Sequence, residues 1–144
     1  MIQNYQQILV PVDGSQNATL AFKRALTVAQ NYHAQLHLVN VIDPRIFQNL
    51  AGNDQSTVDQ ITSNSKELLD KYQQLAQKKR INTDYSIEYG SPKTIIAHKM
   101  TKRWNIDLII MGANGLTTVE RVLMGSVASY VSRTAPCDTL LIRK

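Results

Sequence analysis

The chain has 144 residues, a formal net charge of +5, 43% apolar residues and 19% charged residues. This length and composition are typical of one compact globular domain, so we expect a single domain over residues 1–144 and exclude a disordered chain. No run of about 18 apolar residues is present, and the N-terminal residues lack the pattern of a signal peptide. The single cysteine, Cys137, has no partner for an internal disulfide. We therefore expect a cytoplasmic protein that does not associate with membranes.

The positive net charge does not by itself indicate a nucleic-acid-binding protein. The densest basic group, residues 78–80, closes an expected helix, where cations interact favourably with the helix dipole. A second basic group within residues 99–103 lies near the end of the next expected helix. No aromatic residues alternate with these basic residues as they would on a surface that stacks bases, so we do not expect nucleic acid as a partner.

Taken in chain order, the first elements are a strand, a helix and a second strand. An apolar run over residues 8–12 ends at Asp13-Gly14-Ser15, which indicates a strand followed by a turn. Apolar residues then recur at three- and four-residue steps over residues 18–32, which is the spacing of one helix face. A run rich in Leu, Val and Ile over residues 36–42 predicts the second strand, which ends before Pro44.

The middle of the chain predicts a loop, a long helix and a third strand. Residues 43–53 have no clear hydrophobic pattern and are interpreted as a loop. Residues 54–79 have the strongest helical periodicity, and hydrophobic side chains alternate with polar ones over residues 85–89, as in a strand with one exposed face. The stripe that the long helix is expected to bury consists of Val58, Ile61, Ser65, Leu68, Tyr72 and Leu75.

The last third of the chain predicts two helices and two strands. Ser91-Pro92 supplies the N-cap and the first-turn proline of a helix that runs to about residue 103. Residues 107–111 form a continuous apolar strand, residues 125–134 a final helix and residues 139–143 a closing strand. Strands that alternate with helices in this way indicate parallel pairing with right-handed crossovers. The expected fold class is therefore α/β, a doubly wound parallel sheet with helices on both faces.

Glycines cluster after the fourth expected strand. Gly112, Gly115, Gly125 and Ser126 lie in the segment that leads into the last helix. Ligands of doubly wound sheets bind beyond the carboxyl ends of the strands, and glycines together with a helix N-terminus are suited to phosphate. The alternative is that these residues only form a tight loop and a helix start. Neither the Walker A pattern nor the dinucleotide-binding G-x-G-x-x-G pattern occurs.

These four residues have the spacing G-x2-G-x9-G-S, which resembles the nucleotide-binding signature of the universal stress protein family. Residues 8–15 resemble the first strand and loop of that family, residues 107–112 its fourth strand and residues 136–143 its closing strand. Asp138 departs from the family, which commonly has a second proline or an apolar residue at this position. The resemblance covers nearly the whole chain.

The resemblance implies the strand order 3-2-1-4-5 and a fold similar to that of the adenine nucleotide alpha hydrolases. It also implies the ATP-binding branch of the family, with an Mg²⁺ or Mn²⁺ ion bound with the nucleotide. The site residues that it implies are Asp13 near the ribose or the metal, Pro11 and Val12 beside the adenine, Val41 bonded to the adenine through its backbone, Met111 within the same site, Gly112 near the ribose, and Gly115, Gly125, Ser126 and Val127 around the phosphates.

Other residues have a structural interpretation beside a functional one. Asp13 is also suited to be only a turn residue or a helix N-cap. His33, His37 and His98 lie on different expected elements, so we interpret them as surface or hydrogen-bonded histidines and expect no metal site built from protein side chains. Cys137 is expected to be partly buried and unreactive.

The resulting hypothesis is a nucleotide-dependent stress-response sensor or binding module with at most slow ATP hydrolysis, because Asp13 is the only candidate base near the phosphates. Arg121 is the only cation expected nearby, so the metal ion is expected to balance the phosphate charge. Two alternatives stay open: an adenylyl- or phosphoryl-transferring enzyme of the same superfamily, and a dimeric interaction protein with a vestigial site. A homodimer through residues 139–143 is expected, since this apolar strand would form a sheet edge and the family is similarly dimeric.

Overall fold

The computed structural model describes residues 4–45, 55–115 and 123–144. Five parallel strands form one sheet in the order β3-β2-β1-β4-β5, so the expected fold class and strand order are confirmed. The strand order reverses between β1 and β4, as it does in doubly wound folds. The strands are β1 (Gln7–Pro11), β2 (Gln35–Ile42), β3 (Thr83–Tyr89), β4 (Leu108–Gly112) and β5 (Asp138–Ile142).

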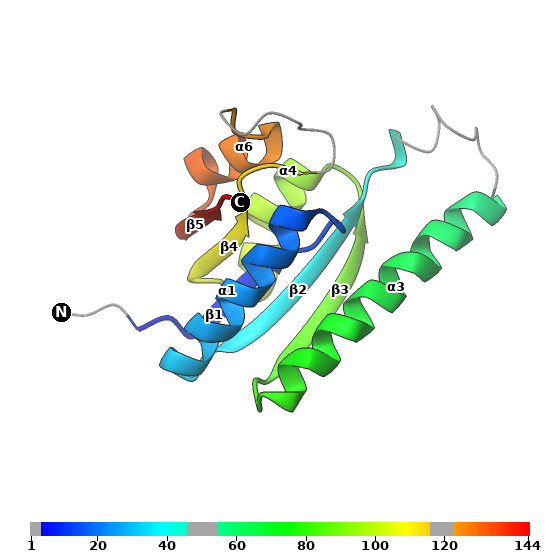
Figure 1. Ribbon diagram of the computed structural model, residues 1–144. Coiled ribbons are helices and arrows are strands. Elements are labelled where there is room, and N and C mark those ends of the chain that lie inside the picture. The colour runs from blue at the N-terminus through cyan, green and yellow to red at the C-terminus, as the bar shows by residue number, and fades with distance from the viewer. Residues whose placement is uncertain (1–3, 46–54, 116–122) are drawn as a thin grey trace.

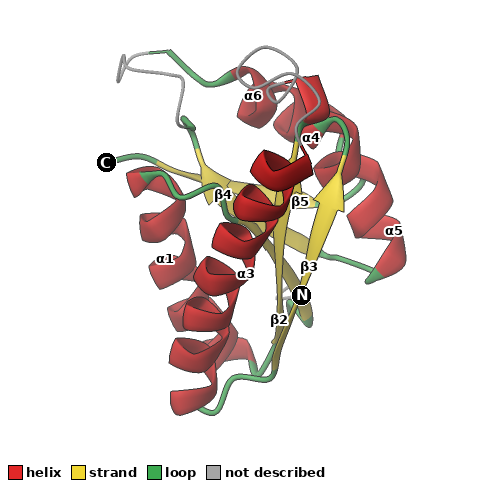
Figure 2. Cartoon of the chain, turned by 90° about the vertical axis from the view of Figure 1, so that its right-hand side faces the viewer, coloured by secondary structure: helices red, strands yellow, loops and turns green. Residues whose placement is uncertain are grey.

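Helices cover both faces of the sheet. Figures 1 and 2 show α1 and α3 on one face and α5 on the other, where α6 also packs. Within the described ranges, no helix is both long and apolar enough to cross a membrane. The helices are α1 (Gln16–Tyr32), α3 (Gln55–Lys78), α4 (Pro92–Thr94), the π-helical turn η1 (Ile95–Lys99), α5 (Met100–Arg103) and α6 (Ser126–Thr134).

A hydrophobic core lies on each side of the sheet. On the face covered by α1 and α3, the rings of Phe22 and Tyr72 stack with their centroids 4.4 Å apart, and Ile8 and Val10 of β1 belong to the same core. On the opposite face, Leu9 packs with residues of η1, α5 and α6. Adjacent residues of β1 therefore point into different cores, which explains why this strand is apolar at consecutive positions.

The long helix α3 follows its expected bounds but buries a slightly different stripe. Ser65 and Tyr72 are buried as expected, and so are Leu69 and Ala76, whereas Leu75 is 39% exposed. Steps of four, three and four residues follow the helical repeat of about 3.6 residues per turn. After Tyr72 the buried face therefore continues at Ala76, and the expectation for Leu75 is wrong.

The helical segment that begins at Pro92 contains an irregular turn. Ser91 occupies the expected N-cap position and Pro92 the first turn, but the Ser91 side chain makes no capping hydrogen bond. The π-helical turn η1 interrupts the α-helical repeat, and Thr101 Oγ1 donates a hydrogen bond of 2.8 Å to the carbonyl of Ala97 within this turn. Hydrophobic spacing does not reveal a single wide turn of this kind, which is often found near functional sites.

Glu88 corrects the expectation that the polar face of β3 is exposed, because this residue is only 8% exposed. Its carboxylate accepts hydrogen bonds from Lys99 Nζ at 2.7 Å, from Arg103 Nη1 at 3.0 Å and from Ser86 Oγ. Burial raises the pKa of this carboxyl, but the hydrogen bonds from Lys99, Ser86 and Arg103 outweigh it and lower the pKa to about 2. The helix that follows β3 therefore supplies the cations that neutralise this edge of the sheet.

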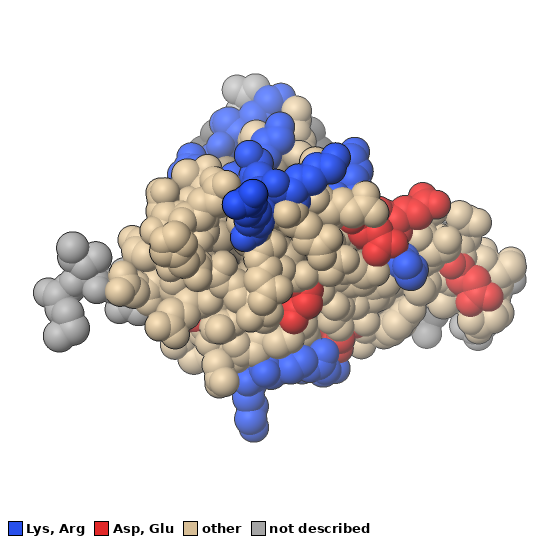
Figure 3. Space-filling view, turned by 90° about the horizontal axis from the view of Figure 1, so that it is seen from below, with Lys and Arg blue, Asp and Glu red and all other residues tan. Residues whose placement is uncertain are grey.

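Basic side chains on the face drawn in Figure 3 lie in separate groups. Figure 3 shows the face formed by the amino-terminal ends of the strands, where uncharged surface lies between the groups of Lys and Arg. Nucleic-acid backbones are usually followed by a continuous basic stripe. This face of the molecule does not present one.

Candidate functional site

A cavity of about 550 Å³ opens at the carboxyl ends of the parallel strands. Its wall is formed by the segments that follow β1, β2 and β4, by side chains of α3 and α4, and by the first turn of α6. Doubly wound folds bind ligands at this edge, where the strand order reverses. All the residues that the sequence predicts for a nucleotide site line this one cavity: Pro11, Val12, Asp13, Val41, Met111, Gly112, Gly115, Gly125, Ser126 and Val127.

Two of the helices that begin at the cavity, α1 and α6, differ in how the N–H groups of their first turns are satisfied. At α1, Ser15 is the N-cap, and its Oγ accepts a hydrogen bond of 3.1 Å from the N–H of Ala18. At α6, the N-cap is Gly125, which has no side chain that accepts such a bond. The first N–H groups of a helix have no partner within the helix and attract anions. The start of α6 therefore offers hydrogen-bond donors to a ligand in the cavity.

Asp13 and Gly115 face each other on the cavity wall. Asp13 Oδ1 accepts a hydrogen bond of 2.9 Å from the N–H of Ser15, which is the turn role considered as an alternative above. A Cβ atom on Gly115 would lie 2.9 Å from Asp13 Oδ2. Asp13 thus has the turn role and also lies in the cavity, and any side chain at position 115 would displace its carboxylate.

Gly112 has a packing role that the sequence did not reveal. A Cβ atom at this position would lie 2.8 Å from Asn17 Cβ and 3.2 Å from the backbone N of Ala18, both in the first turn of α1. Such separations are shorter than ordinary van der Waals contacts. The missing side chain therefore lets β4 and α1 approach each other. Gly112 also lines the cavity, and its expected approach to a ribose stays a prediction.

Asn40 is the centre of a buried polar network that was not predicted as part of the site. Asn40 Nδ2 donates to the carbonyl of Val12 at 2.6 Å, and Asn40 Oδ1 accepts from Ser65 Oγ at 2.8 Å. Asn40 and Ser65 are both buried and both line the cavity. The network connects β2 and α3 to the carbonyl that precedes Asp13. A polar residue within the apolar run of β2 was the signal in the sequence, because buried polar groups need partners.

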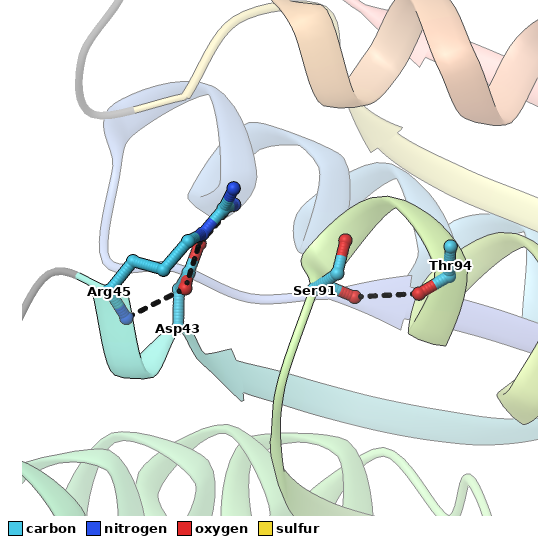
Figure 4. A network of polar contacts seen from close by, with 4 residues as sticks. All are labelled: Asp43, Arg45, Ser91 and Thr94. Atoms are coloured by element: carbon cyan, nitrogen blue, oxygen red, sulfur yellow. Dashed lines mark hydrogen bonds and ion pairs between the residues drawn. The ribbon is translucent and has the colours of Figure 1, made fainter.

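The cavity wall contains cationic side chains that were not expected. Arg45 and Lys93 both line the cavity, so the expectation that Arg121 is the only nearby cation is wrong; Arg121 itself lies outside the described residues. Arg45 Nε donates to Asp43 Oδ1 at 3.0 Å, and Arg45 Nη2 donates to Asp43 Oδ2 at 2.6 Å (Figure 4). These hydrogen bonds hold the pKa of Asp43 below its usual range.

His37 and Cys137 both have a structural explanation: the histidine is hydrogen-bonded and the cysteine is partly buried. His37 is buried, and its Nδ1 and Nε2 form hydrogen bonds of 2.5 Å with Asp84 and 2.7 Å with Gln7. Burial, with a smaller contribution from nearby Asp107, raises the pKa of the half-buried Cys137 thiol to about 11, so little reactive thiolate forms at neutral pH. Across residues 4–45, 55–115 and 123–144, no three or more His, Cys, Asp or Glu side chains form a group that could hold a metal ion.

Comparisons with known proteins show which family this chain resembles. The model of the universal stress protein family matches residues 4–143. A putative universal stress protein of Staphylococcus haemolyticus is 41% identical over 140 residues, which cover 96% of this chain and 85% of that protein. The solved structure of universal stress protein UspA from Lactobacillus plantarum is 33% identical with a TM-score of 0.84, and the match covers 99% of this chain and 100% of that one.

Two more distant solved structures share the fold and contain nucleotides. A universal stress protein in complex with cAMP is 22% identical with a TM-score of 0.73, over 98% of both chains. The universal stress protein from Archaeoglobus fulgidus in complex with dAMP is 19% identical with a TM-score of 0.72, over 98% of this chain and 100% of that one. These two likenesses show the fold alone. The match to the family model and the identity to the staphylococcal protein show that this chain belongs to the universal stress protein family.

Proposed function

We propose that this protein binds ATP in the cavity at the carboxyl ends of the strands, with an Mg²⁺ or Mn²⁺ ion held by the phosphates. The observation that carries the proposal is the convergence of separate chain segments, each predicted from the sequence to bind nucleotide, on one cavity wall. Relatives of the same fold solved with cAMP and with dAMP support an adenine nucleotide as the ligand class.

In this proposal the two ends of the nucleotide contact different parts of the wall. The adenine and the ribose lie against the ends of β1 and β2, where Pro11, Val41 and Asp13 line the cavity. The phosphates lie at the start of α6, where Gly125 supplies no capping side chain and the helix dipole favours negative charge. Gly115 lets the backbone come close to the phosphate oxygens.

The proposed activity is nucleotide-dependent sensing or binding in a stress response, with at most slow ATP hydrolysis. Rapid hydrolysis needs a group that activates or orients the attacking water. The carboxylates on the described part of the cavity wall are those of Asp13 and Asp43. Arg45 occupies the carboxylate of Asp43, and Asp13 already accepts the Ser15 N–H. The Asp43 carboxylate is therefore occupied, and one oxygen of the Asp13 carboxylate is engaged in the turn, which leaves Asp13 as the single candidate base on the described wall.

We also propose a homodimer formed through β5. This strand is at the edge of the sheet, next to β4 only, and edge strands of this kind pair readily with a two-fold-related copy. Light scattering should give the mass of two chains. Leu141→Lys, in the edge strand, should shift the mass toward one chain, whereas Leu75→Lys, on the exposed side of α3, should not. A wild-type monomer would overturn the dimer.

The nucleotide content of the purified protein tests the proposed function. After denaturation, chromatography of the released small molecules should yield an adenine nucleotide in proportion to the protein. For protein stripped of nucleotide, ATP with Mg²⁺ should raise the midpoint of thermal unfolding, because a ligand that binds only the folded state stabilises it. Protein that carries no nucleotide, and whose unfolding midpoint ATP does not change, would refute the proposal.

A further inference from the structure

The charges on the cavity wall leave one cation without an assigned partner. In the described part of the wall the charged side chains are those of Asp13, Asp43, Arg45 and Lys93. The Asp43 side chain is only 11% exposed and its two oxygens are occupied by Arg45. Figure 4 shows this ion pair across from the start of α4. The pair is neutral as a unit, so Arg45 adds little net positive charge for an anionic ligand.

Lys93 differs from the other basic residues of its helical segment. Lys99 and Arg103 are bound to Glu88 at 2.7 Å and 3.0 Å. Lys93, in the first turn of α4, is exposed and forms neither an ion pair nor a side-chain hydrogen bond with any residue that the structure describes. An exposed lysine without a partner is ordinary on a convex surface. Lys93 instead lines a cavity.

The position of α4 places Lys93 on the same side of the cavity as the α6 N-terminus. The two helices pack against each other, as Figure 1 shows at the top of the molecule. The first residues of α6, Ser126 and Val127, line the cavity, and Gly125 leaves this helix without a side-chain cap. A lysine ammonium is a compact charge on a long flexible stem and is suited to phosphate oxygens. Backbone donors and a mobile cation therefore occur together at one end of the cavity.

We infer that Lys93 binds the phosphate end of the nucleotide and favours adenosine ligands with more phosphate groups. This inference rests on the proposed function, because it concerns the same cavity. It assigns to a side chain of α4 part of the charge that was expected from the metal ion alone. The affinity gained from Lys93 should grow with the negative charge of the ligand and should fall as the salt concentration rises.

Calorimetric titration of the full chain with adenosine, AMP, ADP and ATP tests the inference. Lys93→Met removes the charge and keeps an apolar stem. Lys102→Met is the matched control, because Lys102 is an exposed residue of the same helical segment and does not line the cavity. We expect Lys93→Met to weaken ATP binding by at least about fivefold, AMP binding by less and adenosine binding not at all. Lys93→Arg should retain most of the ATP affinity, and Lys102→Met should change none of the affinities.

Two results would overturn the inference and leave the proposed function intact. An unchanged ATP affinity in Lys93→Met would show that the ammonium does not contact the ligand. An equal loss for adenosine and ATP would show that the residue acts on the base or on the fold. If the wild-type chain binds none of the four ligands, the proposed function fails and the inference fails with it. Lys93→Gln gives the same comparison if the methionine variant does not fold.

Discussion

The charged cluster beside β3 and the polar groups at the cavity are built differently. Beside β3, the buried carboxylate of Glu88 is bound by Lys99 and Arg103, so both signs of charge come from the chain. At the cavity, α6 begins at Gly125 without a side-chain cap, and Lys93 has no acidic partner among the described residues. Buried polar groups in native proteins are normally satisfied. A cluster satisfied within the chain stabilises the fold, whereas one that offers donors without acceptors is suited to an anionic ligand.

Gly115→Val should lower the ATP affinity more than any other change considered, because the valine side chain fills the part of the cavity between Gly115 and Asp13. Even the first atom of a side chain would lie 2.9 Å from Asp13 Oδ2, so valine displaces that carboxylate and occupies the space proposed for phosphate. We expect the ATP affinity to fall at least about 100-fold, or about 2.8 kcal/mol, while the midpoint of thermal unfolding changes little. Gly115→Ala should be intermediate. Titration calorimetry that finds wild-type affinity in folded Gly115→Val would remove Gly115 from the site.

Glu88→Gln should weaken the interactions of residue 88 with Lys99 and Arg103 and leave the cavity unchanged. Glutamine keeps the shape of the side chain and removes the charge that Lys99 and Arg103 share. We expect the free energy of unfolding at pH 7 to fall by about 1–2 kcal/mol, a modest loss because both cations are about half exposed. Urea unfolding measures this change. Calorimetry should find the same ATP affinity as in the wild type, and a loss of binding would show that the two clusters are not independent.

The same carboxylate gives a pH dependence whose sign is fixed. The pKa of Glu88 is about 2 in the folded protein, below the value of 4.5 for the free side chain. The ionised carboxylate therefore stabilises the fold above about pH 5, and this contribution is lost as the pH falls toward 2. Urea unfolding at several pH values should show a steeper loss in the wild type than in Glu88→Gln. Parallel curves for the two proteins would count against this ion cluster.

Gly125→Ser should have the smallest effect on stability and ATP affinity. It gives α6 a serine N-cap like that of α1. Gly125 has φ −62° and ψ 154°, close to the φ −74° and ψ 160° of Ser15, so serine fits without backbone strain. We expect the serine to cap α6 and to stabilise the fold by a few tenths of a kcal/mol. Its hydroxyl should compete for the N–H groups and weaken ATP binding by about two- to threefold. Scanning and titration calorimetry measure the two effects, and tighter ATP binding would argue against the α6 donors.

Most of the fold could be predicted because the buried faces are long and regular. Residues 8–12 and 108–111 are apolar throughout because β1 and β4 are covered on both faces. The apolar steps of residues 18–32 match the buried face of α1. The strand order could not be read from periodicity, since a hydrophobic pattern is the same wherever a strand lies in the sheet. It came from the resemblance to the family, and the sheet has that order.

The features that were not predicted depend on contacts between distant segments. Glu88 was expected on an exposed face, but the helix that follows β3 brings Lys99 and Arg103 to it. Lys93 gave no local signal, because a lysine in a helix has the same sequence pattern beside a cavity as beside bulk water. Asn40 did give a signal, as a polar residue inside an apolar strand, although its partners could not be known from sequence.

We expect the cavity to bind an adenine nucleotide because the chain does not satisfy the hydrogen-bond donors at its wall. Calorimetric titration of nucleotide-free wild-type protein with ATP, first with Mg²⁺ and then with EDTA, tests this claim most directly. We predict saturable binding of one ATP per chain, weakened about tenfold or more when EDTA removes the ion, because Lys93 alone does not neutralise a triphosphate. Absence of saturable binding at millimolar ATP, with the ion present and the protein folded, would contradict the account.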